Sequence, residues 1–234
     1  MNLQEFLDFP GQLLFDWQIF TDEAHTVSGD RDVTQFDLTD RFVNQPVLVT
    51  PALAEIMKAE VSRTGKLSVP APDMQAQAAY FDRTFSGERP YKMVGAIAVI
   101  PVTGSLLHRY NFSWRYATGY DFITAMTELA EEDPDVKGIA YDMNSGGGQV
   151  DGAFECAAAI KSCKKPTRAV IDAHSYSACY LLASACDQRV IAQSGGAGSI
   201  GVVTMHVDMG EMLDNIGYKV SFIFAGDHKV DGNP

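Results

Sequence analysis

A serine and a lysine that could form a catalytic pair stand far apart in this sequence. Ser177 lies in the run His174–Tyr180, where a predicted strand ends and a predicted helix begins, and Lys229 lies in the polar run 225–231. A serine hydroxyl is a poor nucleophile at neutral pH and needs a base. A lysine amine serves as that base when burial lowers its pKa until the neutral form is populated. The pair therefore suggests a hydrolase in which Lys229 takes the proton from Ser177.

Both residues also have an ordinary structural interpretation. A serine at a helix start is a common N-cap, and a lysine in a loop is usually solvated. His174 lies close in sequence to Ser177, and His228 adjoins Lys229, so a serine–histidine pair is the first rival. No serine lies in a Gly-x-Ser-x-Gly motif, which disfavours an α/β-hydrolase nucleophile elbow.

The glycine-rich run 144–150 directly follows a predicted strand. Glycines let the backbone approach a substrate and point N–H groups at it. The run therefore suggests an oxyanion hole made by the N–H of Gly147 and a donor next to Ser177, at Ala178. A flexible turn and a phosphate-binding loop are the alternatives, but the Gly-Lys-Ser/Thr of a Walker A loop is missing.

A second glycine-rich run, Gly196–Gly201, matches the Gly-x-Gly-x-x-Gly pattern of dinucleotide-binding proteins. That motif must open a helix, whereas the residues from Ile200 onward have the pattern of a strand, so we expect a tight turn instead. Ser199 within this turn could hold the lysine amine in place or could be a simple turn serine.

Composition limits the function classes. The net charge is −12, with 18 basic and 30 acidic residues, whereas binding to a phosphate backbone needs clustered Lys and Arg. We expect no nucleic-acid partner, and no stretch approaches the roughly 18 apolar residues of a membrane span. No secretory signal is visible. The four cysteines, at positions 156, 163, 179 and 186, lack zinc-site spacing and are expected to be reduced core residues, which suits a cytoplasmic location.

The elements that must position these residues follow an α/β pattern after residue 92. Predicted strands alternate with predicted helices, which implies parallel strands with helices outside the sheet. The expected strands are 94–102, 138–143, 167–173, 189–192, 200–207 and 218–224, and the expected helices are 120–132, 151–163 (capped by Asp151), 177–186 and 209–216. Because ligands bind at the carboxyl ends of such strands, the runs 144–150, 174–177 and 225–231 should converge on one site.

The region before residue 92 has weaker signals and no assignable chemistry. Thr50 and Pro51 are typical of a helix start, with Ala52–Val61 carrying the helical periodicity. A second short helix is expected over 76–85. We therefore divide the chain into an N-terminal, mostly helical region, 1–92, and an α/β region, 93–234.

Four ordered segments resemble peptidase family S49, the signal peptide peptidase A family, and within it the head-maturation proteases of lambda-like phages. The segments are Asp142–Gly148, Ser177–Ala185, Gly198–Val202 and Gly226–Pro234. The first segment departs from the usual Pro-Gly-Gly of the family, because Gly146 stands in the place of the proline.

The resemblance implies roles for individual residues. Ser177 would be the nucleophile, Lys229 the general base, Gly147 an oxyanion-hole donor and Ser199 the contact that orients the lysine. It also implies a crotonase-like fold shared with the Clp protease subunit, homo-oligomers, and no metal or nucleotide cofactor. The phage branch cuts scaffold and other head proteins inside the procapsid, in the cytoplasm of the bacterial host. Because family members continue beyond the lysine, we expect 93–234 to be a C-terminally incomplete peptidase core.

Two further functions remain open from the residues alone. One is a catalytically inactive assembly or scaffold-binding protein that retains the fold. The other is a crotonase-type acyl-CoA enzyme, which would share the sheet but would not need Ser177 and Lys229.

Overall fold

Three long strands form the centre of the protein. They are β5 Ile97–Leu107, β8 Gly138–Gln149 and β9 Thr167–Tyr176, and all three run parallel with β8 in the middle. The computed structural model describes residues 35–43, 45–70, 89–205, 210–219, 221, 223, 225 and 226. Within these residues the strands belong to a ten-stranded sheet of order β10-β9-β8-β5-β7-β6, with four further strands paired to members of that path.

The remaining strands extend this central group at its edges. β10, β7 and β11 run parallel to their neighbours, whereas β4, β6, β2 and β12 pair antiparallel. Their bounds are β2 Pro46–Val49, β4 Lys92–Val94, β6 Ser113–Trp114, β7 Ala117–Gly119, β10 Gln188–Ile191, β11 Gly196–Gly198 and β12 Val203–Thr204.

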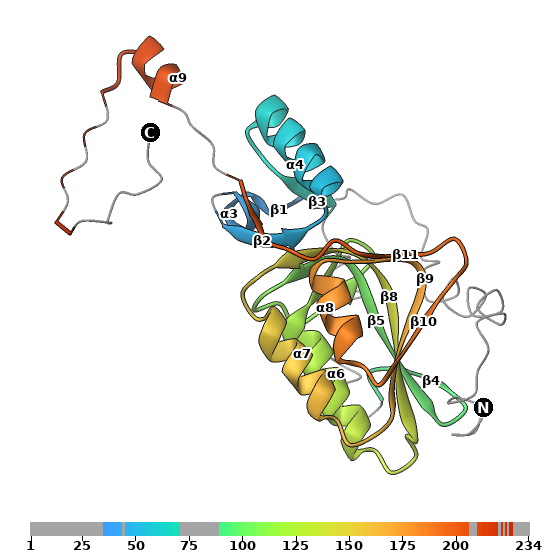
Figure 1. Ribbon diagram of the computed structural model, residues 1–234. Helices are drawn as coiled ribbons and strands as arrows, with labels where there is room; N and C mark the ends of the chain where they lie inside the picture. The colour runs from blue at the N-terminus through green and yellow to red at the C-terminus, as the bar shows by residue number, and fades with distance from the viewer. Residues whose placement is uncertain are drawn as a thin grey trace.

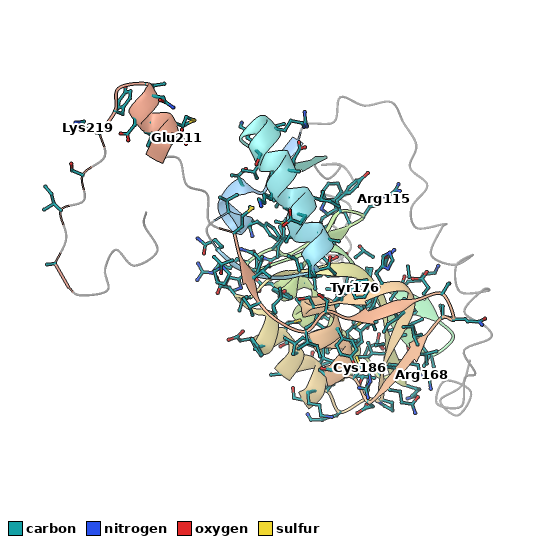
Figure 2. All side chains as sticks on the ribbon, turned by 45° about the horizontal axis from the view of Figure 1, so that its top comes forward. Arg115, Arg168, Tyr176, Cys186, Glu211 and Lys219 are labelled. Carbon is teal, nitrogen blue, oxygen red and sulfur yellow. The ribbon has the colours of Figure 1, made fainter. Side chains whose placement is uncertain are left out.

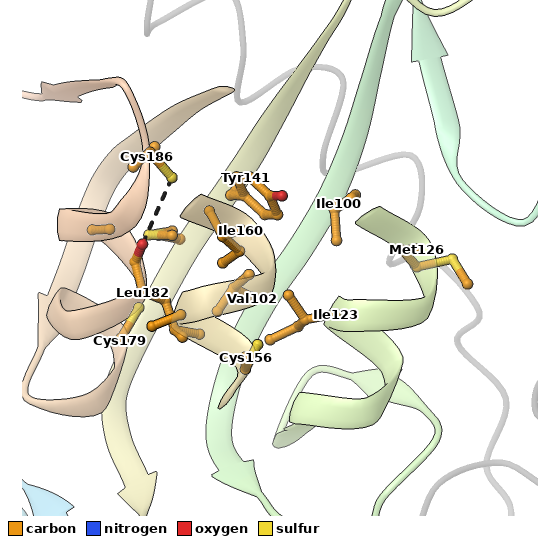
Figure 3. Packing of buried hydrophobic residues seen from close by; sticks show 14 of the residues in the cluster. Ile100, Val102, Ile123, Met126, Tyr141, Cys156, Ile160, Cys179, Leu182 and Cys186 are labelled. Carbon is orange, nitrogen blue, oxygen red and sulfur yellow. Dashed lines mark hydrogen bonds between the residues drawn. The ribbon is translucent and has the colours of Figure 1, made fainter. Parts of the chain in front are cut away.

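Three helices pack on one face of the sheet, as Figure 1 shows: α6 Tyr120–Glu132, α7 Ala153–Ser162 and α8 Ala178–Ala185. Their apolar side chains and those of the central strands form one buried cluster, part of which is drawn in Figure 3. Cys156, Cys179 and Cys186 lie in this cluster, and all four cysteines are free thiols, as predicted. The dashed line in Figure 3 is the bond from Cys186 Sγ to the Leu182 carbonyl, 3.7 Å long. The α/β class is therefore confirmed.

The predicted elements of this core are largely correct, but several boundaries differ. The helix over 120–132 is confirmed to the residue. The strand expected over 94–102 is instead a hairpin of β4 and β5, which turns at Gly95 and Ala96. Asp151 does not cap α7, because the N-cap is Gly152 in the left-handed conformation.

The largest difference is at the glycine-rich run, which was expected to be a loop. β8 continues through Gly148 to Gln149, because β5 pairs with it on one side and β2 on the other. Two register shifts, next to Thr103 and to Met143, mark where the strands bend.

The N-terminal elements lie against this end of the sheet. β1 Gln35–Asp37 pairs with β3 Ser68–Pro70, and α3 Thr39–Phe42 precedes β2. α4 Pro51–Thr64 begins as predicted, since the Thr50 hydroxyl accepts from the Leu53 N–H at 3.1 Å. The helix expected over 76–85 lies outside the described residues. The division at residue 92 stays a prediction, but β2 belongs to the large sheet.

The described residues after β12 make few contacts with the sheet. α9 Gly210–Asn215 has no buried residue and stands apart from the sheet in Figure 1. The strand expected over 218–224 is wrong for its described residues, which are in neither a helix nor a strand. Among the helices described, none is long and apolar enough to cross a membrane.

Candidate active site

Ser177 lies at the junction between β9 and α8 in a strained backbone conformation. Its φ is 55° and its ψ is −117°, a region that costs a non-glycine residue about 1–3 kcal/mol and persists only where the surroundings impose it. The Ser177 N–H donates to the Gly198 carbonyl at 2.7 Å, and its own carbonyl accepts from the Leu181 N–H at 2.9 Å. These two bonds hold the junction in place.

The Ser177 hydroxyl does not cap the helix that it precedes. Ser177 occupies the N-cap position of α8, as the ordinary interpretation expects, but its side chain makes no capping bond there. The hydroxyl lies 3.5 Å from the Gly201 carbonyl oxygen. The whole residue is only 4% exposed. Strain and burial together leave a serine whose side chain has no structural task in its own helix.

Gly147 lies beside Ser177 at a position where only glycine fits. Its φ is +107°, and a Cβ there would lie 2.0 Å from the Leu48 carbonyl oxygen and 3.1 Å from Ser177 Cβ. The structure thus brings Gly147 and Ser177 together. The Gly147 N–H, the expected oxyanion donor, donates to the Ser145 hydroxyl at 3.1 Å.

Ser145 is a buried polar residue to which the sequence analysis gave no role. It is 2% exposed, and its hydroxyl donates to the Gly104 carbonyl at 2.6 Å while accepting from Gly147. It faces Ser175 across the β8–β9 pair. A hydroxyl two residues before the key glycine is the only sequence signal that could have found it.

Cys179 lies in α8, and its Sγ is 3.4 Å from the hydroxyl oxygen of Ser175. Burial raises the pKa of the Cys179 thiol to about 12. Because the thiolate is the reactive form, Cys179 does not compete with Ser177 as a nucleophile.

Ser199 follows the residue whose carbonyl binds the Ser177 N–H. Its backbone also has a positive φ, 54°, and its side chain is half-buried, whereas the adjoining Ile200 is 87% exposed. Gly196–Gly198 form β11, parallel to β9. The glycine-rich run therefore forms a strand edge and a turn rather than a helix start, as predicted.

Residues 159–234 match the model of peptidase family S49, and this segment contains Ser177, Ser199 and Lys229. The chain is 40% identical over 205 residues to the head-tail preconnector protein GP5 of Enterobacteria phage P21, covering 81% of this chain and 41% of that protein. It is 36% identical over 207 residues to the capsid assembly protease C of Escherichia phage lambda, covering 82% and 47%. The chain belongs to peptidase family S49.

The chain spans less than half the length of these two phage relatives. Similar solved structures include a stomatin-specific protease, 1510-N, at 18% identity and a TM-score of 0.35, with 47% of each chain covered. They also include an enoyl-CoA hydratase/isomerase family member at 16% identity and a TM-score of 0.34, with 43% of this chain and 46% of that chain covered.

The predicted base of this S49 chain, Lys229, lies outside the described residues, as does His228. Figure 2 shows Tyr176, directly before Ser177, on the body of the molecule, and Lys219 on the segment that leads toward Lys229. Of the three runs expected to converge, the structure brings 144–150 and 174–177 together. The third is described only at Ala225 and Gly226, both exposed.

His174, the rival base, is exposed and its ring stacks on Tyr176 with 5.6 Å between centroids. No hydrogen bond joins it to Ser177 among the described residues. His108 lies in a different place, an open cleft of about 760 Å³ along α6 and α7 that none of the predicted site residues line. In the described part of the chain, no cluster of three or more His, Cys, Asp or Glu could hold a metal ion.

Proposed function

We propose that this chain carries the catalytic core of a serine endopeptidase with Ser177 as nucleophile and Lys229 as general base. One observation carries the proposal: a strained serine, free of any capping task, lies against Gly147 at the ends of two parallel strands. Membership of family S49, through a match that includes Ser177 and Lys229, supports it.

The reaction would proceed through an acyl-enzyme. Ser177 Oγ attacks the peptide carbonyl carbon while the neutral Lys229 amine takes its proton. The tetrahedral intermediate collapses as Lys229 returns the proton to the leaving amine, and the C–N bond breaks. Water then hydrolyses the ester, with Lys229 again as base.

The oxyanion would be bound by backbone N–H groups of Gly147 and Ala178. Ala178 is the first residue of α8, where the positive end of the helix dipole favours negative charge. Gly147 must exchange its Ser145 acceptor for the oxyanion. Ser199, next to the carbonyl that fixes Ser177, is proposed to orient the lysine amine.

Protein substrates of the phage head follow from the relatives rather than from the geometry. One phage relative is named a head-tail preconnector protein and the other a capsid assembly protease. We propose that the substrates are scaffold, portal or capsid proteins, cut by a homo-oligomer within the procapsid in the host cytoplasm.

Replacing Ser177 by alanine tests the nucleophile. Cleavage of co-expressed head proteins should fall by about 10³-fold or more, because the covalent step is lost. Ser184→Ala is the matched control, since Ser184 is an exposed serine on the same helix. Retained cleavage by Ser177→Ala at an unchanged melting temperature contradicts the assignment.

The pH profile tests the base. Lys229→Met should abolish cleavage, and the rate of the unsubstituted protein should rise toward alkaline pH. A rate governed by a single group titrating near pH 6.5 would point to a histidine instead.

An inactive assembly protein is the second candidate, because Ser177 is buried. The Ser177 hydroxyl and the Gly147 N–H are also both bonded to groups within the protein. Fluorophosphonate labelling separates the two functions. Labelling that maps to Ser177 supports the peptidase, and its absence in every variant supports the inactive protein.

A further inference from the structure

Strand β2, from the N-terminal region, runs directly past the candidate nucleophile. It pairs antiparallel with the glycine-rich end of β8, placing Val49 opposite Gly147 and Val47 opposite Gln149. Its other edge pairs with β12, just after Ser199–Val202. β2 thus lies between the two segments that flank Ser177.

The position of β2 is the one that an extended peptide would need. β9 separates from β8 after Ser145, so beyond that residue the edge of β8 facing away from β5 is open to another strand. A peptide whose carbonyl carbon must reach Ser177 beside Gly147 would use this edge, because backbone pairing is the general way to bind an extended chain. In the structure β2 fills it, and the Leu48 carbonyl contacts Gly147.

Both groups needed for attack are occupied in this state. The Gly147 N–H donates to Ser145, and the Ser177 hydroxyl lies at the Gly201 carbonyl. These partners lie in β8 and in the turn after β11, so β2 adds to the closed state by filling the edge of β8 rather than by bonding either group.

β2 packs against both the N-terminal region and the body of the protein. Val47 and Val49 lie in a cluster that N-terminal residues share with Leu107 and Ala117, whereas Leu48 packs in the main core, so β2 must withdraw one core side chain to leave.

Backbone pairing with β8 and a bond from the Val150 N–H to the Pro46 carbonyl at 3.4 Å hold β2 to the body. Arg41 adds side-chain and backbone bonds that we call the latch: Arg41 Nη1 donates to the His108 carbonyl at 2.7 Å, and Gln149 Nε2 donates to the Arg41 carbonyl at 3.1 Å.

We propose that β2 is a self-inhibiting strand, an intramolecular occupant of the peptide-binding edge that must leave before a substrate reaches Ser177. This inference rests on the proposed function of Ser177. The Arg41 latch stabilises the closed state, in which β2 is paired with β8. Weakening the latch should therefore expose Ser177, and a disulfide between β2 and β8 should keep Ser177 covered.

A disulfide between β2 and β8 tests the proposal. Val47 and Gln149 are directly opposite across an antiparallel pair, where Cα separations of about 4.5–5.5 Å suit a disulfide. In Val47→Cys/Gln149→Cys, oxidation should slow fluorophosphonate labelling of Ser177 by about tenfold or more, since the competent fraction falls, and reduction should restore it. Because Gln149→Cys also removes the amide that bonds the Arg41 carbonyl, the oxidised double variant is compared with its own reduced form, and each single-cysteine variant is likewise compared oxidised and reduced as the control.

A variant that weakens the latch should have the opposite effect to the disulfide and speed up the labelling of Ser177. Arg41→Ala should raise the labelling rate about tenfold, because it removes a charged donor to the His108 carbonyl. Equal labelling of the oxidised and reduced lock, with far-UV circular dichroism showing both folded, overturns the self-inhibiting role while Ser177 remains the nucleophile. No labelling in any form, Arg41→Ala included, overturns the proposed function itself.

Discussion

The segments that carry the two predicted catalytic residues differ in how the protein holds them. Ser177 sits between a central strand and a buried helix, and its backbone is bonded on both sides. After Ser199 the described residues are mostly exposed, and α9 buries none of its side chains. The core therefore positions the proposed nucleophile, whereas the described residues after Ser199 have little buried surface to hold them in place.

Glycine substitutions in the two regions should give the largest contrast. Gly147→Ala should destabilise the protein by about 4 kcal/mol, from backbone strain plus overpacking. Gly217 also has a positive φ, 87°, but an added Cβ meets nothing within 4 Å, so Gly217→Ala should cost only about 1 kcal/mol. Urea unfolding measures both, and equal costs would remove the distinction between the regions.

Replacing apolar side chains by alanine should give a smaller difference in stability loss between the two regions than the glycine substitutions. Leu182 is fully buried in the main cluster, so Leu182→Ala should cost about 3 kcal/mol. Met212 in α9 is 55% exposed, and Met212→Ala should change stability by less than about 0.5 kcal/mol. A larger loss for Met212 would reveal that α9 packs against something in solution.

A carboxyl group on the central strands should make the stability of the core depend on pH. Burial and the nearby negative charge of Asp172 raise the pKa of Asp142 to about 7. The folded state then holds its proton more tightly than the unfolded state, so stability falls as the pH rises from about 4 to 7. Since Asp142 is only partly buried, we expect Asp142→Asn to stabilise the protein by about 2 kcal/mol at pH 8.

Unfolding curves of this variant at pH 4 and pH 8 provide the measurement, and the gain should disappear at pH 4. Asp214→Asn on exposed α9 is the matched control for replacing a carboxylate by an amide. A gain of equal size at both pH values would mean that the effect does not come from ionisation of Asp142.

Local patterns predicted most of the core because the signals that form these elements are short-range. The helix from Tyr120 to Glu132 has apolar residues at helical spacing, and its buried face includes Phe122, Ile123, Met126 and Ala130. The start of α4 was also predictable, since Thr50 and Pro51 act on their own helix.

Predictions failed where a distant strand decided the conformation. The glycine run was expected to be a loop because glycine is depleted in strands, yet pairing with β5 and β2 makes it the end of β8. The alternating residues from Tyr218 onward were expected to be a strand. In their described part they pair with no strand, and Ile223 is fully exposed.

The sequence by itself determined the α/β class, the family and the identity of Ser177 and Gly147 as site candidates, because four ordered motifs and local periodicity carry that information. Tertiary structure alone decided the strain at Ser177, the bond from Gly147 to Ser145 and the insertion of β2 beside them. Each of these depends on contacts between residues that are distant in the chain, or on the exact path of the backbone between them. The spacing of residue types along the sequence specifies neither these distant contacts nor the exact path of the backbone.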